Sequence, residues 1–339
     1  MSSELTKEEI LQQIKEYTVK EEFKKALRIT EAPKVSFLAQ GEYNINYLLE
    51  TSKEKFVLRL NTGSQMHLDN QIKYEYQALE YLVSSNVTPT PLLLDDSCEE
   101  LPFGLLVMSY LPGRSLVYER DLIKGAKVLA NVHQVSVPKE NQLIVEEKPL
   151  SGIWEECSKL IPTYLESSLG KIEVKRVLNR MINDLDKLRN QEEDIMNILP
   201  FSIVNTEVNS GNFIIDNDKG YLVDWEKPLV TTPLQDLSHF MVPTTTLWKT
   251  DYRMTKEDRE CFIKVYCQER GFGSNKFQEI KEALDIFDKY STMRGISWSA
   301  MAWVEYQQPD RLLKNQYTFE KMDMYLQEEF LVELFSEFE

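Results

Sequence analysis

Residues 204–224 read VNTEVNSGNFIIDNDKGYLVD, and this stretch decides the fold. Two short runs of strand-forming residues flank the turn sequence NDKG, which predicts a β-hairpin over 213–224. Asn212 and Asp224 then lie at the open end of the hairpin, with Cα atoms about 5 Å apart for facing positions. Glu207 on the preceding loop adds a third oxygen donor. Convergent oxygen donors without His or Cys suit a hard cation such as Mg²⁺, completed by phosphate and water. The alternative is an ordinary loop, because Asn, Ser and Gly are common turn residues.

The segment before residue 110 has the pattern of a small β-rich lobe. Apolar residues alternate with polar ones in 43–49 and 56–60 across a TSKE turn, which predicts a hairpin that follows a glycine turn at Gly41. Helical spacing returns in 70–84, and two further short strands are expected at 92–94 and 105–108. An N-terminal helix is predicted after Thr6, which forms a capping box with Glu9.

Two charged residues in this lobe break the local rules. Glu75 lies on the apolar stripe of the 70–84 helix, where an unpaired charge is costly. Arg59 lies on the sheet face opposite Phe56, Leu58 and Leu60, because successive side chains of a strand point to opposite faces. We therefore expect Glu75 to pair with Arg59 and to leave the guanidinium able to hold an anion such as phosphate. A plain structural ion pair is the other interpretation.

A third feature is the turn Gly41-Glu42-Tyr43-Asn44, whose backbone N–H groups could cover phosphates. The turn lacks GxGxxG and GxxxxGK[ST], so an ordinary β-turn is the alternative.

Beyond Ser109 to Gly113, which predict a short linker, the pattern becomes mostly helical. The expected helices span 121–135, 153–166, 172–199, 256–269, 276–290, 292–307 and 318–337, with one β interruption at 203–225. The predicted fold class is therefore α+β with two lobes: a small antiparallel sheet with one main helix, and a larger, mostly helical lobe. The predicted division is an N-terminal helical flank at 1–33, an N-lobe at 34–109 and a C-lobe at 110–339.

Composition restricts the classes of partner. The 339 residues are 42% hydrophobic, enough for a sizeable core without disulfides. With 39 Lys and Arg against 55 Asp and Glu, the net charge of −16 disfavours nucleic acid and anionic membrane surfaces as partners. Four scattered cysteines and no long apolar run predict a soluble, cytoplasmic protein. Only three histidines are present, and His133 lies on an apolar helical stripe that predicts a core position.

Taken in order, these features resemble the aminoglycoside phosphotransferase and choline kinase family, small-molecule kinases with a protein-kinase-like fold. The matching stretches are GEYNINYLLE, FVLRL, YEYQALEYL, LLVMSYLPGRSL, EVNSGNFIID, YLVDWE and LQDLSHF, within about residues 35–240. VDWE in place of DFG, and an arginine as the strand cation, are similar to this family rather than to protein kinases.

The resemblance implies Mg²⁺ and ATP as cofactors and assigns roles to residues. Arg59 would contact the ATP phosphates, braced by Glu75, under the turn that holds Gly41 and Asn44. The nucleotide would also meet the linker residues Met108, Ser109, Tyr110 and Leu111. Asn212 and Asp224 would bind Mg²⁺, Glu207 would be the catalytic carboxylate, and Asp236 would stabilise the catalytic region.

The catalytic loop departs from the family pattern. The family usually reads His-Gly-Asp-Leu-His-Pro-Gly-Asn where this chain has Asn205 to Asn212, so both histidines are asparagines and the aspartate is Glu207. The extra methylene moves the carboxylate about 1.5 Å, a displacement that can cost about 10²-fold in rate. Phosphoryl transfer depends mainly on positioning and electrostatics, so slowed catalysis is compatible with this change.

These observations support two hypotheses about function. The first is an ATP- and Mg-dependent kinase that acts on a hydroxyl of a small molecule. The alternative is a catalytically inactive, nucleotide-binding pseudokinase with a regulatory or structural role. The acidity is compatible with a cationic acceptor, and Trp298, Trp303 and Glu305 could cage one, although their spacing is also that of a core helix. The sequence leaves the identity of the acceptor open.

Overall fold

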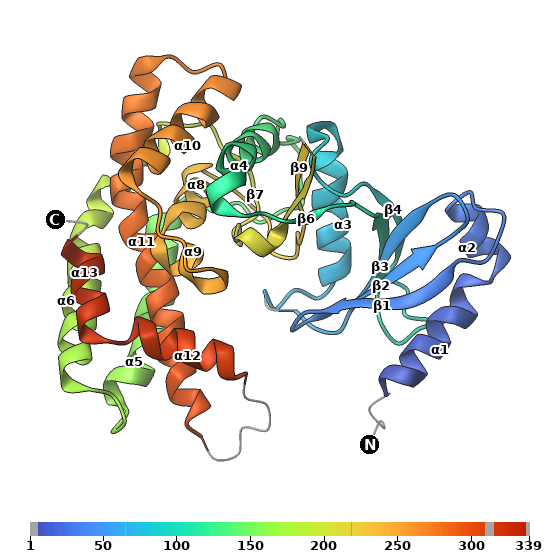
Figure 1. Cartoon of the computed structure of the whole chain (residues 1–339), viewed down its shortest axis with the longest axis horizontal. Helices are drawn as coiled ribbons and strands as arrows, with labels where there is room; N and C mark the ends of the chain where they lie inside the picture. The colour runs from blue at the N-terminus through green and yellow to red at the C-terminus, as the bar shows by residue number, and fades with distance from the viewer. Residues whose placement is uncertain (1–5, 65, 218, 309–314, 337–339) are drawn as a thin grey trace.

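The computed structural model describes residues 6–64, 66–217, 219–308 and 315–336. A five-stranded antiparallel sheet of order β1-β2-β3-β5-β4 forms one end of the molecule, and most of the helices form the other (Figure 1). Its strands are β1 (Lys34–Gln40), β2 (Asn44–Glu50), β3 (Lys55–Asn61), β4 (Pro91–Asp95) and β5 (Leu105–Ser109). The predicted α+β class, with a small antiparallel sheet and a larger, mostly helical part, is confirmed. The domain limits at residues 34 and 110 stay predictions.

Helices cover both faces of this sheet. The alternation of β3 sends Leu58 and Leu60, both fully buried, to the face that packs against α1 (Lys7–Thr18) and α2 (Glu21–Ala26). Thr6 caps α1 through the predicted capping box with Glu9. Val57 and Arg59 point to the opposite face, where α3 (Gln71–Leu82) lies between the sheet and the helical part (Figure 1). The N-terminal helices α1 and α2 thus cover one face of the sheet, the outer face. The opposite, inner face carries Arg59 and faces α3.

The helical part follows the linker. Its elements are α4 (Tyr118–His133), α5 (Pro149–Glu166), α6 (Ile172–Leu188), α7 (Glu192–Met196), α8 (Leu234–Met241), α9 (Pro243–Lys249), α10 (Lys256–Glu269), α11 (Ser274–Tyr306), α12 (Gln316–Tyr325) and α13 (Glu328–Ser336). Most helix boundaries differ from the sequence prediction by a few residues, and in three places the number of helices differs. The two helices expected at 276–290 and 292–307 are one helix, α11, because the junction holds no proline or cap that would stop it.

The opposite error occurs in two other helices. The helix expected at 172–199 ends at Leu188, and Glu192 after the break accepts the backbone N–H groups of Leu150 and Ser151 at 2.7 and 3.0 Å. It thereby caps α5, a tertiary contact that periodicity does not reveal. The helix expected at 318–337 divides near Leu326 into α12 and α13. The short helices α8 and α9 were not predicted, since each is too short to show a clear period.

The predicted hairpin is confirmed. β8 (Phe213–Asp216) pairs with β9 (Lys219–Leu222) antiparallel, with Phe213 opposite Leu222. The turn residue Asp218 lies outside the described residues. β6 (Arg114–Ser115) adds a third strand, while β7 (Ser202–Val204) pairs with β10 (Leu229–Thr231). The hairpin and the β7–β10 pair hold the 205–212 loop and the 223–228 segment close together.

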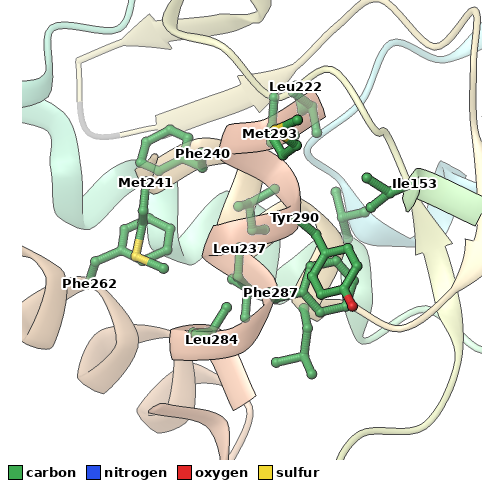
Figure 2. Packing of buried hydrophobic residues seen from close by; sticks show 14 of the residues in the cluster. Ile153, Leu222, Leu237, Phe240, Met241, Phe262, Leu284, Phe287, Tyr290 and Met293 are labelled. Atoms are coloured by element: carbon green, nitrogen blue, oxygen red, sulfur yellow. The ribbon is translucent and has the colours of Figure 1, made fainter. Parts of the chain in front are cut away.

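One apolar core joins α3 to the helical part. Buried side chains of α3, including Leu79, belong to the same cluster as Phe240 and Leu237 of α8 and Phe287 of α11. Figure 2 shows the centre of this cluster, where α8 and α11 meet. The ring of Phe240 stacks on that of Phe262 at 4.8 Å between centroids.

Among the described residues, no helix is both long and apolar enough to cross a membrane.

The packing of Phe240 predicts a large loss of stability on truncation. The side chain is fully buried against Phe213, Tyr118 and Phe262. Phe240→Ala is expected to lower the free energy of unfolding by about 3–5 kcal/mol, through lost burial and the cavity that remains. Urea denaturation followed by tryptophan fluorescence would measure it. Val332→Ala, at a 52% exposed position, is the control, and an equal effect of both changes would contradict this view of the core.

Candidate active site

A buried ion pair links the sheet to α3. Nη1 of Arg59 on β3 lies 2.5 Å from Oε1 of Glu75 on α3, as predicted. The same Nη1 lies 3.1 Å from Oδ1 of Asp224, which follows β9, and Nε donates to Asn46 on β2 at 3.0 Å. Arg59 and Glu75 are 6% and 1% exposed. One guanidinium therefore joins three elements that are far apart in the sequence.

The surroundings favour the charged form of Arg59. Burial opposes its charge, but the carboxylates of Glu75 and Asp224 outweigh burial and raise the pKa of Arg59 above its ordinary value. Removing one partner of such a buried pair leaves an uncompensated charge, which costs about 3–5 kcal/mol. Arg59 is thus a fixed cation on the inner face of the sheet.

The side chain of Asp236 on α8 anchors the 205–212 loop by hydrogen bonds. Its two carboxylate oxygens accept the backbone N–H groups of Asn205 and Thr206, each at 2.8 Å. Nε2 of His133 lies 3.3 Å from Oδ2 of Asp236, and Nδ1 lies 3.2 Å from the Tyr266 hydroxyl, so His133 is a satisfied core histidine as predicted. Thr206 has a positive φ of 70°, an uncommon backbone conformation for a β-branched residue. Asp236 therefore determines the path of the loop, in agreement with its predicted role.

Glu207 projects from this loop toward the segment after β9. Its Oε1 lies 2.5 Å from Nζ of Lys227, and its side chain is 32% exposed. The backbone oxygen of Glu207 accepts the side-chain N–H of Asn212 at 2.8 Å and that of Asn209 at 3.2 Å. The two asparagines thus fix the loop backbone around the carboxylate.

The hairpin end brings Asn212 and Asp224 together, with an offset from the expected facing pair. The backbone N–H of Val223 donates to the carbonyl of Asn212 at 2.9 Å, so Val223 is opposite Asn212 and Asp224 is one residue beyond. Asn205 donates to the carbonyl of Asp224 at 2.8 Å, and Asp224 has a φ of 65°. This left-handed turn directs the chain from β9 across the loop. Within the described ranges, no group of three or more His, Cys, Asp or Glu forms a metal cluster, and the predicted pair contains only one of these residue types.

Glu226 is a residue of the site that the sequence pattern did not indicate. Its Oε2 accepts a hydrogen bond from Nδ2 of Asn44, and its backbone oxygen accepts Nε2 of Gln71 at 2.6 Å. Burial, followed by the nearby carboxylates of Asp224 and Glu207, raises the pKa of Glu226 to about 7. The signal in the sequence was a second acid in VDWE, but only the fold shows that it faces β2 and α3.

The predicted turn at Gly41 and Asn44 forms, but its role in binding phosphate is not tested by the structure. The N–H of Gly41 donates to the carbonyl of Asn44 at 2.9 Å, and a Cβ on Gly41 would meet nothing closer than that same atom at 3.8 Å. Glycine is therefore not needed at this position for the turn itself. The Asn44 side chain is buried and joins Asn61 to Glu226. Contact of either residue with phosphate stays a prediction.

The linker continues from β5. Met108 is buried, while the N–H groups of Ser109 and Tyr110 bond to the carbonyls of Thr90 and Lys55 at 2.9 and 3.4 Å. The N–H of Leu111 has no hydrogen-bond partner among the described residues. Contact of these linker residues with a nucleotide stays a prediction.

The tryptophans on α11 have different neighbours. Trp298 is 38% exposed and meets Trp248 edge-on, whereas Trp303 packs on Tyr164 and donates to Asp323 at 3.1 Å. They do not form the walls of one shared cage.

Two pockets lie away from the site around Asp224. One, of about 330 Å³, opens beside α1 and β4, and the other, of about 220 Å³, opens between α5 and α6. No residue of the site lines either pocket.

Comparisons with known proteins identify the family and the fold of the chain. The sequence model of the phosphotransferase enzyme family (APH) matches residues 34–277, which is more than half of the chain. The chain therefore belongs to the phosphotransferase enzyme family. The search of curated proteins gave no match.

Solved structures share the fold at low sequence identity. A candidate aminoglycoside phosphotransferase from Ralstonia eutropha is 14% identical with a TM-score of 0.64, covering 97% of this chain and 98% of its own. Choline kinase from Cryptosporidium parvum is 14% identical with a TM-score of 0.60 and 90% coverage of each chain. A spectinomycin phosphotransferase, solved with ADP and spectinomycin, is 13% identical with a TM-score of 0.55, covering 88% and 91%.

The contacts of Asp236 predict that Asp236→Asn disorders the loop. An amide keeps only one acceptor oxygen and turns its NH₂ toward a backbone N–H, so one buried donor loses its partner. We expect a loss of about 2–4 kcal/mol in the free energy of unfolding. Hydrogen exchange should also become faster at residues 205–212. Asp184→Asn, at an exposed position, is the matched control. Unchanged exchange in the loop of Asp236→Asn would contradict the anchoring role.

His239 predicts a dependence of stability on pH. Burial, followed by the charge of Arg294, lowers the pKa of His239 from its ordinary value of 6.5 to about 4. Between these values the unfolded chain binds the proton more readily, so the contribution of His239 is complete above pH 6.5 and is lost as the pH falls toward 4.

The test compares thermal unfolding of the wild type and His239→Gln from pH 7 to pH 4. The variant should lose less of its melting temperature over this range. Exposed His67→Gln should follow the wild type. Equal pH dependence of the His239 variant and the wild type would refute the assignment.

Proposed function

We propose that this protein is an ATP- and Mg-dependent phosphotransferase that transfers the γ-phosphoryl group to a hydroxyl of a small molecule. The observation that carries the proposal is the convergence of Glu75, Arg59 and Asp224, with Nη1 of Arg59 at 2.5 and 3.1 Å from the two carboxylates. Membership of the phosphotransferase family supports it, as do related structures solved with ADP, AMP and AMP-PNP.

The donor set fits a hard divalent cation. Glu75, Asp224, Glu226 and Glu207 bring four carboxyl groups to the site, against the two cations Arg59 and Lys227. Such an excess of negative charge is unfavourable without added positive charge. Burial first, and then the carboxylates of Asp224 and Glu207, raise the pKa of Glu226, and a bound cation would relieve the repulsion among these groups. Asp224 and the amide oxygen of Asn212 would hold Mg²⁺, since both are oxygen donors and Asp224 is partly exposed.

The protein side chains would divide the work of transfer. Mg-ATP would supply the phosphoryl group and shield its charge. Arg59 would bind the phosphate oxygens, with Glu75 fixing the guanidinium, and the N–H of Leu111 would meet the base. Glu207 would accept the proton of the acceptor hydroxyl. The hydroxyl oxygen would then bond to the γ-phosphorus while the bond between this phosphorus and the ADP oxygen breaks. Asp236 would hold the loop that presents Glu207.

A nucleotide-binding pseudokinase is the second candidate. One observation favours it: the loop carries Asn205, Glu207 and Asn209 where the family usually has histidine, aspartate and histidine. In this case the nucleotide would bind through Arg59 and Leu111 without turnover.

Transfer of label from γ-labelled ATP separates the two candidates. A panel of alcohols, amino alcohols and aminoglycosides, tested with Mg²⁺, should include an acceptor that becomes phosphorylated. Asp224→Asn should lower the rate by about 10²-fold or more, because it removes charge stabilisation of the phosphates.

The control for folding is the thermal unfolding of each variant, and Asp251→Asn, at an exposed position, should keep full activity. A nucleotide-induced thermal shift without any transfer would favour the pseudokinase. Transfer that persists at the wild-type rate in Asp224→Asn would refute the assigned site.

A further inference from the structure

Lys227 is the cation closest to the catalytic-loop carboxylate. Its Nζ lies 2.5 Å from Oε1 of Glu207, and its side chain is only 11% exposed. In the sequence, Lys227 is a single lysine after VDWE, and no local pattern indicates a role for it. A charged amine so far removed from water is costly unless its partner is fixed and close. The pair therefore constrains both side chains.

The backbone of Lys227 is tied to the same loop. Its carbonyl accepts the Thr206 hydroxyl at 2.9 Å, while the neighbouring Pro228 carbonyl accepts the Tyr74 hydroxyl of α3 at 2.6 Å. The lysine is thus held at its base by the loop and by α3. Its ammonium group reaches Glu207 from a fixed origin.

The ion pair places this ammonium beside the proposed site. Glu207 lies on the loop that ends at Asn212, whose side chain donates to the Glu207 carbonyl at 2.8 Å, and Lys227 follows Asp224 by three residues. A carboxylate that accepts a proton from a hydroxyl lies about 2.6–3.2 Å from its oxygen. Because Nζ of Lys227 binds Oε1, the other carboxylate oxygen, Oε2, would be the one that faces the acceptor hydroxyl.

We propose that Lys227 is a positioning residue for phosphoryl transfer, which holds one oxygen of Glu207 so that the other faces the acceptor hydroxyl. The inference rests on the proposed function. Glutamate has one more rotatable bond than aspartate, so its carboxylate is harder to hold in one place. The ion pair with Lys227 removes that freedom. It also gives a physical reason for the glutamate: an aspartate would end about 1.5 Å short of the ammonium.

The test uses Lys227→Met and Lys227→Arg in the full chain, with labelled Mg-ATP and the acceptor panel, water included. Lys227→Met should lower kcat by about 10²-fold while KM for ATP changes less than about threefold, because a misplaced carboxylate affects the transfer step and not nucleotide binding. Lys227→Arg keeps the charge and should recover most of kcat. Lys187→Met, on the surface of α6, is the control.

A double-mutant cycle provides a readout that needs no turnover. In the nucleotide-free protein, Glu207→Gln and Lys227→Met should each lower the melting temperature. The double variant should be more stable than the sum of the single effects predicts. In the transfer assay, Lys227→Met should add little to the loss caused by Glu207→Gln.

The outcomes separate the two proposals. Normal wild-type transfer with unchanged kcat in Lys227→Met, or additive losses in the double variant, would overturn the positioning role alone. An absence of transfer by the wild type would overturn the proposed phosphotransferase function and the positioning role with it. An equal fall of kcat in Lys227→Met and Lys187→Met would also overturn the positioning role, because a surface lysine would then have the same effect.

Discussion

The ion pair between Arg59 and Glu75 is the contact on which the rest of the site depends. Both side chains are almost completely buried, so neither charge can be solvated, and each requires the other. The pair forces α3 against the inner face of the sheet and sets the position of the guanidinium. Asp224 then meets this guanidinium from the other part of the molecule. A single cation thus aligns the sheet, the main helix and the hairpin end.

A second buried carboxylate, Asp236, fixes the 205–212 loop, just as Glu75 fixes Arg59 on the sheet. It binds two backbone N–H groups and leaves the Glu207 side chain partly exposed. The segment 223–228 lies between these two anchors and contributes Asp224, Glu226 and Lys227. Under the proposed function, Mg²⁺ would offset the excess of acidic groups in this segment. The overall charge of −16 would then be no obstacle to ATP, because Arg59, Lys227 and the metal ion would supply positive charge locally.

Much of the site could be predicted from local sequence rules. Glu75 on an apolar helical stripe required a cation, and strand alternation supplied Arg59 on the correct face. The NDKG turn indicated the hairpin that ends near Asn212 and Asp224. The contacts of Glu226 and Lys227 could not be predicted in this way. Their partners, Asn44, Gln71 and Glu207, lie on three other segments, and no periodicity relates them.

The sequence by itself determined the two-lobe α+β class, the paired charges of Arg59 and Glu75 and the oxygen donors of the hairpin end. These follow from burial and alternation within single elements. Tertiary structure alone decided where α6 ends, since Glu192 is needed to cap α5, and that α11 continues through residue 291. It also decided the one-residue offset of Asp224 and the pairing of Lys227 with Glu207. These features depend on how separate segments meet, and packing and hydrogen bonding in the folded chain determine that arrangement.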